Sequence, residues 1–408
     1  MRADATARAG CDTLTMAEPE RVHRISARRR DGATVTPLEL FFDLVFVLAI
    51  TQCSALMDSG GSWRTVVQGL LVLGVLWWSW VGFAWLTSVV DPDDWLPRVV
   101  MFVAMAAMLV MALCVPQVFD DRALGLTFAG AYAVGRAAHI GLFSIASADD
   151  PLLRRSVISL GCGSVVGVSL IAVAALADGW AQAALWFVAL GIDMAVPFLF
   201  GSEGWHLEPH HFSERHGLIV LIALGESIVA LGAGTKVGLD AGVVTAAVLG
   251  VALAAAMWWS YFDVGSKLAA RRLVETPPGQ VQNEMARDGY SFLHYPIVAG
   301  VVVVALALEH VLAHVDEPLD ATASVALGGG IALFLFGQVA FKLRMTGLLG
   351  RQRVVPALLL VLAIPLFRVV DGWVSLTIAA TVMWLLIAWE LHQYRDVRAE
   401  IRRWDSTR

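Results

Sequence analysis

Residues 65–88 read TVVQGLLVLGVLWWSWVGFAWLTS, a run without a single charged side chain. A helix needs about 20 mostly apolar residues to cross the hydrocarbon core of a bilayer, so this run predicts a membrane-spanning helix. The whole chain has the same character, because 58% of its 408 residues are hydrophobic and 16% are charged. An ordinary soluble domain is about 25% charged, so this composition excludes a soluble enzyme.

Eleven further runs are long and apolar enough to span a membrane, which predicts an all-α, polytopic transmembrane helical bundle of about 12 spans. The connections between most of these runs are short, and they leave no room for a separate soluble domain. The predicted spans cover residues 38–57, 65–88, 98–118, 123–147, 156–177, 181–200, 214–234, 240–263, 291–314, 321–343, 354–370 and 373–393.

The positions of the basic residues predict the orientation of the bundle. Cytoplasmic segments of membrane proteins are enriched in Lys and Arg, and 24 of the 29 basic residues fall on one side if the N-terminus is inside. Both termini are therefore predicted to be cytoplasmic. The net charge of -6 shows no basic excess, so no nucleic-acid partner is expected.

Similar words recur in the two halves of the chain and predict a parallel internal repeat of six plus six spans. Trp77-Trp78-Ser79 matches Trp258-Trp259-Ser260, Gly135-Arg136 matches Gly337-Gln338, and Asp178-Gly179-Trp180 matches Asp371-Gly372-Trp373. Spans one and seven then occupy equivalent places. The expected parts are a disordered cytoplasmic tail at 1–37, a first six-helix repeat at 38–200, a His-rich loop at 201–213, a second six-helix repeat at 214–393 and a cytoplasmic tail at 394–408.

Two motifs give the chain a family resemblance. Residues 37–47 read PLELFFDLVFV at the start of span one, and span seven carries Glu214-Arg215-His216 and then Gly225-Glu226-Ser227. With these words the chain resembles the bacterial low temperature requirement protein A (LtrA) family. The resemblance implies a multi-pass protein of the bacterial cell membrane, linked by its name to growth in the cold, and it implies no substrate. A more distant similarity relates Phe42-Asp43 to the Phe-Ser-Asp word of six-plus-six potassium channels, but span seven lacks an Asp at that place.

Charged residues inside the predicted spans are the main site candidates. A charge at the bilayer centre costs about 2.5–3.5 kcal/mol on insertion scales, so such a residue usually faces a partner or a wet cavity. Arg136 shares a polar stripe of span four with His139, and Asp193 in span six is its natural acidic partner. We interpret this group either as a relay or anion contact, or as a structural ion pair.

Three carboxylates on spans one and seven are candidates for an ion path. Glu39 and Asp43 occupy one face of span one at i and i+4, where they are either N-terminal caps or functional groups. Glu226 lies near mid-membrane on span seven, about 16 Å along the helix from Arg215 and too far to pair with it. It needs another partner or a proton. A wet cavity joining Asp43 and Glu226 is expected of a transport path, and a dry, paired core is expected of a structural role.

The histidine-rich segment 205–216 and the tryptophans allow two readings each. His211 and Glu214, at i and i+3, are the best metal-ligand pair there, and the alternative is an interfacial loop that titrates near neutral pH. His310 and His314 form a second set that we expect on the opposite side of the membrane. The repeat-motif tryptophans, which are Trp77, Trp78, Trp258 and Trp259, are interpreted as core packing or as a ligand-stacking wall.

The function favoured by the sequence is a transporter or channel for a small solute or ion along the interface of the two repeats. Candidates for its path are Glu39, Asp43, Arg136, His139, Asp193 and Glu226, with the carboxylates as proton or cation sites. The alternatives are a metal-dependent intramembrane enzyme acting on a lipid, and a structural or signalling membrane protein. The sequence requires no cofactor, and the expected partners are the lipid bilayer, a small solute or ion, and a second copy in a homodimer.

Overall fold

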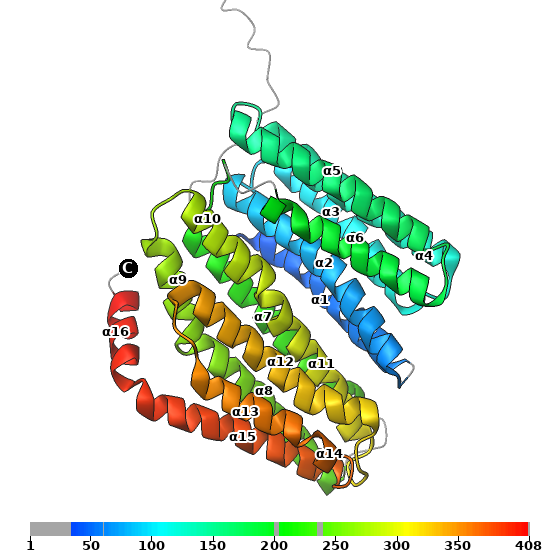
Figure 1. Ribbon diagram of the computed structural model, residues 1–408, viewed down its shortest axis with the longest axis vertical. Helices are drawn as coiled ribbons and strands as arrows, with labels where there is room; N and C mark the ends of the chain where they lie inside the picture. The colour runs from blue at the N-terminus through cyan, green and yellow to red at the C-terminus, as the bar shows by residue number, and fades with distance from the viewer. Residues whose placement is uncertain (1–33, 60, 200–203, 235–239, 407–408) are drawn as a thin grey trace, which may run out of the picture.

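The computed structural model describes residues 34–59, 61–199, 204–234 and 240–406, which form helices and no strand (Figure 1). The helices are packed side by side along their length, and one isolated β-bridge joins Pro318 to Asp371. Their bounds are α1 Pro37–Asp58, α2 Trp63–Val89, α3 Trp95–Cys114, η1 Val115–Gln117, α4 Arg122–Ala146, α5 Pro151–Ala174, α6 Gly179–Leu199, α7 Pro209–Gly234, α8 Ala241–Phe262, α9 Gly265–Glu275, α10 Gln280–Ala286, the π-helix η3 Arg287–Phe292, α11 His294–Ala313, α12 Ala321–Thr346, α13 Arg351–Leu362, α14 Ile364–Phe367, α15 Gly372–Gln393 and α16 Arg395–Ser406.

Ten of the described helices are long and apolar enough to cross a membrane, two fewer than the predicted twelve. The chain therefore has the architecture of a multi-pass membrane protein. The two predicted spans outside this set are α4, which is 25 residues long, and the α13–α14 segment, which is broken into helices of 12 and 4 residues. Helix α4 carries the buried polar side chains Tyr132, Arg136 and His139.

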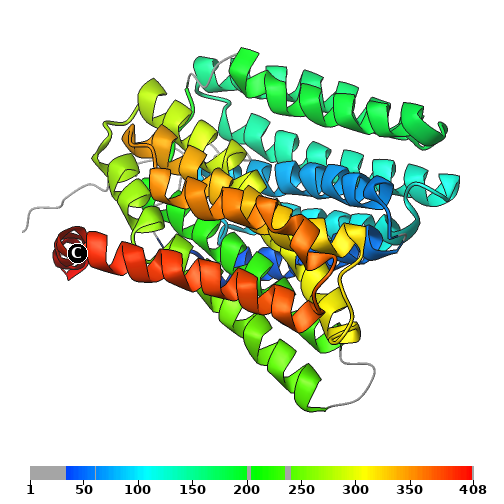
Figure 2. The ribbon, with the colours of Figure 1, turned by 60° about the horizontal axis from the view of Figure 1, so that its bottom comes forward.

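The helices of the two halves have the same order of neighbours. In the first half α1 packs against α2 and α3, α4 lies between α3 and α5, and α6 packs against α5 and α2. In the second half α7 packs against α8 and α11, α12 lies between α11 and α13, and α15 packs against α13 and α8. Figure 1 shows the two sets side by side, with α5 at one edge and α15 at the other, and Figure 2 shows them from a second direction.

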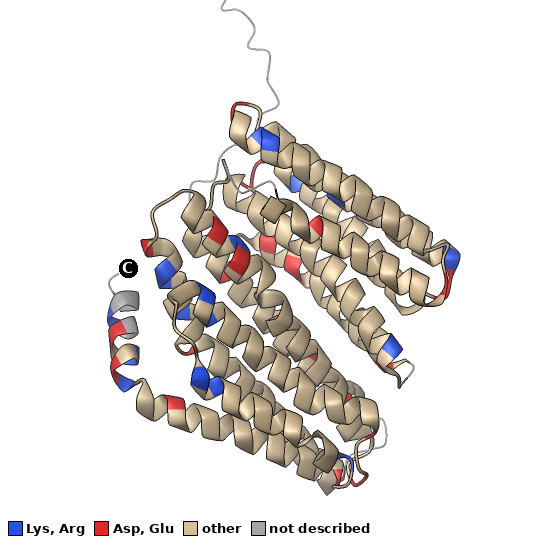
Figure 3. Cartoon of the chain, in the orientation of Figure 1, with Lys and Arg blue, Asp and Glu red and all other residues tan. Residues whose placement is uncertain are grey.

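The centre of the bundle is formed by α1, α2, α7 and α11, which hold the two halves together. The α11–α12 contact within the second half is especially close: a Cβ on Gly300 would lie 2.6 Å from the backbone nitrogen of Phe334 and 2.7 Å from the carbonyl oxygen of Gly330. Glycine at position 300 therefore permits backbone packing that any side chain would disrupt. Few charged side chains lie between the helix ends, because the core is tightly packed (Figure 3).

The connecting segments differ from the predicted parts. Helix α7 begins at Pro209, inside the predicted loop 201–213, because proline is well suited to the first position of a helix. The connection 264–290 contains α9 and α10, and most of the predicted tail 394–408 is the helix α16. The predicted disorder of 1–37 falls mainly on residues outside the described part of the chain, and α1 itself begins at Pro37.

Candidate functional site between helices α1 and α7

The first turn of α1 is fixed by a capping box. The backbone N–H of Thr36 donates to Glu39 Oε2 at 2.9 Å, the Glu39 N–H donates to the Thr36 hydroxyl at 3.4 Å, and Pro37 occupies the first helical position. Such a box satisfies two backbone donors that have no partner within the helix. Glu39 is thus a cap, as one of the two sequence interpretations has it, and its second oxygen remains available for another contact.

That second oxygen faces α7. Glu39 Oε1 lies 2.7 Å from His211 Nε2 and 3.7 Å from Arg215 Nη1, and all three side chains are fully buried. The other ring nitrogen of His211 lies 3.2 Å from the Ser88 hydroxyl of α2. A charge buried this deeply is stable only when paired and hydrogen-bonded, which these contacts provide.

One turn further along, Asp43 and Arg215 form the second contact between the same helices. Arg215 Nη2 donates to Asp43 Oδ1 at 2.6 Å, and the same oxygen accepts from Trp80 Nε1 at 2.7 Å. Arg215 Nη1 also donates to the Thr87 hydroxyl at 3.0 Å. Its guanidinium lies over the Trp80 ring, with the central carbon 5.3 Å from the ring centre, in a cation–π contact.

Glu226 lies at the third contact between α1 and α7. Its Oε2 accepts a hydrogen bond of 2.6 Å from the Thr51 hydroxyl, and the side chain is 3% exposed. Within the described part of the chain this carboxyl has no basic side chain in ion-pair contact. From residue 39 to 43 to 51 along α1, the contacted residue on α7 moves from 211 to 215 to 226. The two helices therefore run in the same direction.

The charges around Asp43 are paired and closely packed, although Asp43 Oδ2 and Arg215 Nε have no hydrogen-bond partner among the described residues. The five main cavities formed by the described residues have neither Asp43 nor Glu226 in their walls. Of the two outcomes expected from the sequence, the open wet path between these carboxylates is absent from this conformation of the described residues. The ion pairs at Glu39 and Asp43 instead close the α1–α7 interface at one end.

Arg136 and Asp193 are brought together in a separate cluster. Arg136 Nη2 lies 3.3 Å from Asp193 Oδ1, Nε donates to the Ser164 hydroxyl at 2.9 Å, and the Tyr132 hydroxyl donates to Asp193 Oδ2. The pairing predicted from the sequence is therefore present, and it ties α4, α5 and α6 together. His139 is buried beside this cluster, with its ring against Gly82 of α2.

The family of the chain follows from its sequence. The family described as bacterial low temperature requirement A protein (LtrA) matches residues 34–388, which include every helix described above except α16 and the end of α15. The chain belongs to the LtrA family. An uncharacterised protein of Rhizobium meliloti (strain 1021) is 26% identical over 396 residues, covering 94% of this chain and 95% of that protein. No solved structure matches the chain.

The four repeat-motif tryptophans of this LtrA family member have different surroundings. Trp77 and Trp78 are buried, and Trp77 Nε1 donates to the backbone oxygen of Ser291 at 2.8 Å. Trp258 is 44% exposed on the outside of the bundle, and Trp259 is half-buried against Trp384. Core packing thus describes the first pair, whereas the pair with the same sequence motif on α8 lies nearer the outer surface.

The structure separates the two metal-ligand candidates. His211 is buried and directed to Glu39, whereas the side chain of Glu214 is exposed. Within the described ranges no group of three or more His, Cys, Asp or Glu side chains is arranged to hold a metal ion. His310 and His314 contact each other at the far end of α11, away from His211.

The sequence did not reveal the role of several buried charges. The sequence predicts only that Arg215 is too far from Glu226 on its own helix to pair with it, whereas its carboxylate partners lie on α1. Arg353 was interpreted as an orientation charge, but it is buried and its Nε donates to Glu390 at 2.8 Å. The signal that could have found Arg353 is its place directly before the predicted span eleven, with Glu390 as an acidic residue inside the predicted span twelve.

Proposed function

We propose that this LtrA family protein moves protons or small cations along the α1–α7 interface, and that the described conformation is closed. The observation that carries the proposal is Glu226, a buried carboxyl whose hydrogen-bond partner is the Thr51 hydroxyl and which forms no ion pair with a basic side chain of the described residues. A charge there needs compensation, which a transported proton or cation would supply. Buried ionisable residues in membrane helices commonly mark such paths.

The arrangement of helices supports this location. The sequence motifs shared by the two halves and the common order of helix neighbours support treating α1 and α7 as equivalent helices of a parallel six-plus-six repeat. Sites in transporters built from repeats lie at the interface between the repeats, near the middle of the membrane. In the proposed cycle the Glu39–His211 and Asp43–Arg215 contacts are the closed gate on the predicted cytoplasmic side.

The test is flux through purified protein in proteoliposomes. Vesicles with a pH-sensitive dye inside receive a potassium or sodium gradient, and internal pH and cation content are followed. We expect flux from the wild type and its loss in Glu226→Gln, which keeps the shape of the side chain and removes its charge. Glu214→Gln, on the same helix but exposed, is the matched control and should retain wild-type flux.

Size-exclusion profiles must show that all three proteins are folded. Equal flux in Glu226→Gln and the wild type would remove Glu226 from the path. A folded wild type that passes neither protons nor alkali cations would contradict the proposed function and favour the structural role of the buried charges.

A further inference from the structure

The outside of the α1–α7 pair is apolar, with a polar patch partway along it. We call this surface the outer α1–α7 face. Its exposed apolar side chains are Phe41, Leu44, Leu221 and Ile228. Thr51 and Gln52 of α1 are half-exposed within it. Both helices are long and apolar enough to span a membrane, so in a monomer this face would contact lipid.

Glu226 opens onto the same face through one carboxyl oxygen. Its Oε2 accepts the 2.6 Å hydrogen bond from half-exposed Thr51, and its neighbour Gly225 is exposed. The polar atoms that are fully enclosed without a partner include Asp43 Oδ2 and Ser227 Oγ but not Glu226 Oε1. No described residue donates to Oε1. This oxygen therefore reaches the surface through the small opening that leaves Glu226 3% exposed.

Other hydroxyls on the outside of the bundle are satisfied within their own helix. Ser169 donates to the Val165 carbonyl oxygen at 2.7 Å, and Thr245 donates to that of Ala241 at 2.7 Å. Lipid tolerates such groups because their hydrogen bonds are made inside the helix. Gln52 differs from them, since its side-chain amide forms no hydrogen bond with the described residues.

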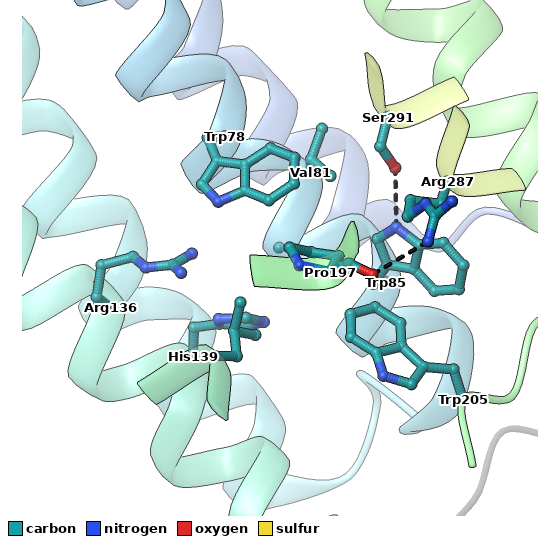
Figure 4. A pocket seen from close by; sticks show the side chains of 11 residues that line it. Trp78, Val81, Trp85, Arg136, His139, Pro197, Trp205, Arg287 and Ser291 are labelled. Atoms are coloured by element: carbon teal, nitrogen blue, oxygen red, sulfur yellow. Dashed lines mark hydrogen bonds between the residues drawn. The ribbon is translucent and has the colours of Figure 1, made fainter. Parts of the chain in front are cut away.

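None of the five main cavities formed by the described residues opens at Glu226. The cavity shown in Figure 4 lies among Trp78, Arg136 and His139, and Thr51 does not line it either. Ionisable side chains in membrane helices face a protein interior or a water-filled cavity, and glutamine side chains form hydrogen bonds across helices. The outer α1–α7 face therefore suits a protein partner better than lipid.

We propose that the outer α1–α7 face binds the same face of a second copy of this chain, in a symmetric dimer whose axis lies along the membrane normal. A two-fold contact uses the same surface on both copies, so the polar patch of one copy meets that of the other. Gly225 lies within the face, and a Cβ added to it would meet no atom within 4 Å. Small residues at such places let membrane helices approach each other closely.

The dimer would complete the surroundings of Glu226. In one copy its free oxygen opens toward the bilayer, whereas in the dimer this opening faces protein. Two Glu226 carboxyls brought toward one axis repel each other as anions, and a proton or cation between them removes that repulsion. This step rests on the proposed proton or cation path, whereas the dimer itself rests only on the polar patch of the outer α1–α7 face.

Counting the chains in lipid vesicles tests the dimer. The full chain, with one dye per copy, is reconstituted at graded protein-to-lipid ratios, and photobleaching steps per vesicle are compared with those expected from random capture. We expect two steps to predominate for the wild type. Gly225→Trp should raise the protein-to-lipid ratio at which half of the chains are dimeric by about tenfold, the usual size of a steric mismatch in a packed contact.

Gly191 on α6 provides a matched control. It is also exposed, it lies near the middle of its helix, and a Cβ added to it would meet no atom within 4 Å. Gly191→Trp should therefore leave the dimer at its wild-type level. In a protein whose four cysteines are replaced by serine, Gly225→Cys should form a disulfide-linked dimer when membranes are treated with copper phenanthroline, and Gly191→Cys should not.

Several results would overturn the dimer. Single bleaching steps for the wild type at every ratio would show that lipid covers the face. Equal weakening by Gly225→Trp and Gly191→Trp, or equal cross-linking of the two cysteine variants, would show that the contact is elsewhere or random. Flux through a monomeric protein would overturn the dimer and leave the proposed function standing, whereas a dimer without flux would contradict the proposed function alone.

Discussion

At the scale of single residues, Arg215 is the side chain on which the α1–α7 junction depends. It contacts Asp43 and Thr87 through hydrogen bonds, approaches Glu39, and lies over the Trp80 ring. The planar guanidinium can serve several acceptors at once, which a lysine cannot. Since two carboxylates and the guanidinium are all buried, none of them can be removed alone without leaving an uncompensated charge.

Arg215→Met should therefore lower the free energy of unfolding by about 3–5 kcal/mol, the usual effect of breaking a buried ion pair from one side. The combined variant Glu39→Gln, Asp43→Asn, Arg215→Met removes all three charges with little change in volume, and we expect it to recover most of that loss. Thermal unfolding in detergent measures the stability of the single and the triple variant. A triple variant less stable than Arg215→Met would contradict this account of the junction.

The sequence predicted some of these contacts and not others for a physical reason. Arg136 and Asp193 were paired correctly because each is an isolated charge of opposite sign inside an apolar span. Glu39 and Asp43 were correctly placed on one face of a helix. Arg215 was not assigned to them because spacing along one segment shows which residues share a face, but it does not show which other helix that face contacts.

At the scale of helices, two matched pairs of residues hold α1 to α7. Glu39 and Asp43 are four residues apart on α1, and His211 and Arg215 are four residues apart on α7. Residues at this spacing lie one above the other, so two parallel helices can contact each other twice with the same periodicity. The second pair was missed because His211 was assigned to a loop, and the start of α7 at Pro209 places it in the first turn.

The N-terminus of α5 shows how a charged cap fixes a helix start. Asp150 Oδ1 accepts hydrogen bonds of 3.1 Å from the N–H groups of Leu152 and Leu153, and His206 lies 3.5 Å from the same carboxyl. The Leu153 N–H is the main cause that lowers the pKa of Asp150 below its ordinary value. A carboxyl with a lowered pKa in the folded state stabilises the fold above its unfolded pKa, and this contribution is lost as the pH falls through the folded value.

Asp150→Ala should therefore cost about 1 kcal/mol at pH 7, the usual value of an N-cap, and the cost should shrink below about pH 4. Asp150→Asn is the matched control, because asparagine also caps helices but does not titrate. We expect it to remain close to the wild type at pH 7 and to lack the acid-dependent loss. Unfolding midpoints from pH 7 to pH 3 measure this, and an unchanged midpoint in Asp150→Ala at pH 7 would contradict it.

At the scale of the whole molecule, each half contains one buried arginine–carboxylate cluster that joins its fourth, fifth and sixth helices. In the first half the arginine is Arg136 on α4, and in the second it is Arg353 on α13, which pairs with Glu390 and also donates to Gln338. In the proposed repeat, Gln338 corresponds to Arg136. Both halves therefore contain such a cluster, but its guanidinium comes from α4 in the first half and from α13 in the second. A comparison of the two sequences alone does not match the two arginines.

The helix directions decide how many times the chain should cross the membrane. Contacts show that α1 and α7 run in the same direction, so an even number of crossings must separate their starts. The candidate spans α1, α2, α3, α5 and α6 give an odd number, and α4 supplies the sixth. In the second half Trp384 of α15 contacts Ala252 of α8, and Arg398, which follows α15, contacts Asp263, which follows α8. Helices α8 and α15 are therefore also parallel. The α13–α14 segment must then cross the membrane between α12 and α15. Twelve traversals are therefore expected.

The turns on either side of α4 distinguish twelve crossings from ten, whereas the termini lie on the same side in both cases. Asp120 and Asp149 are exposed residues in these turns. In a protein whose four cysteines are replaced by serine, Asp120→Cys should react with a membrane-impermeant maleimide on intact cells, and Asp149→Cys should react only after the cells are opened. Helix α4, at 25 residues and about 1.5 Å per residue, is long enough for this crossing. Equal labelling of both cysteines on intact cells would mean that α4 does not cross, and it would remove the basis for equating α1 with α7.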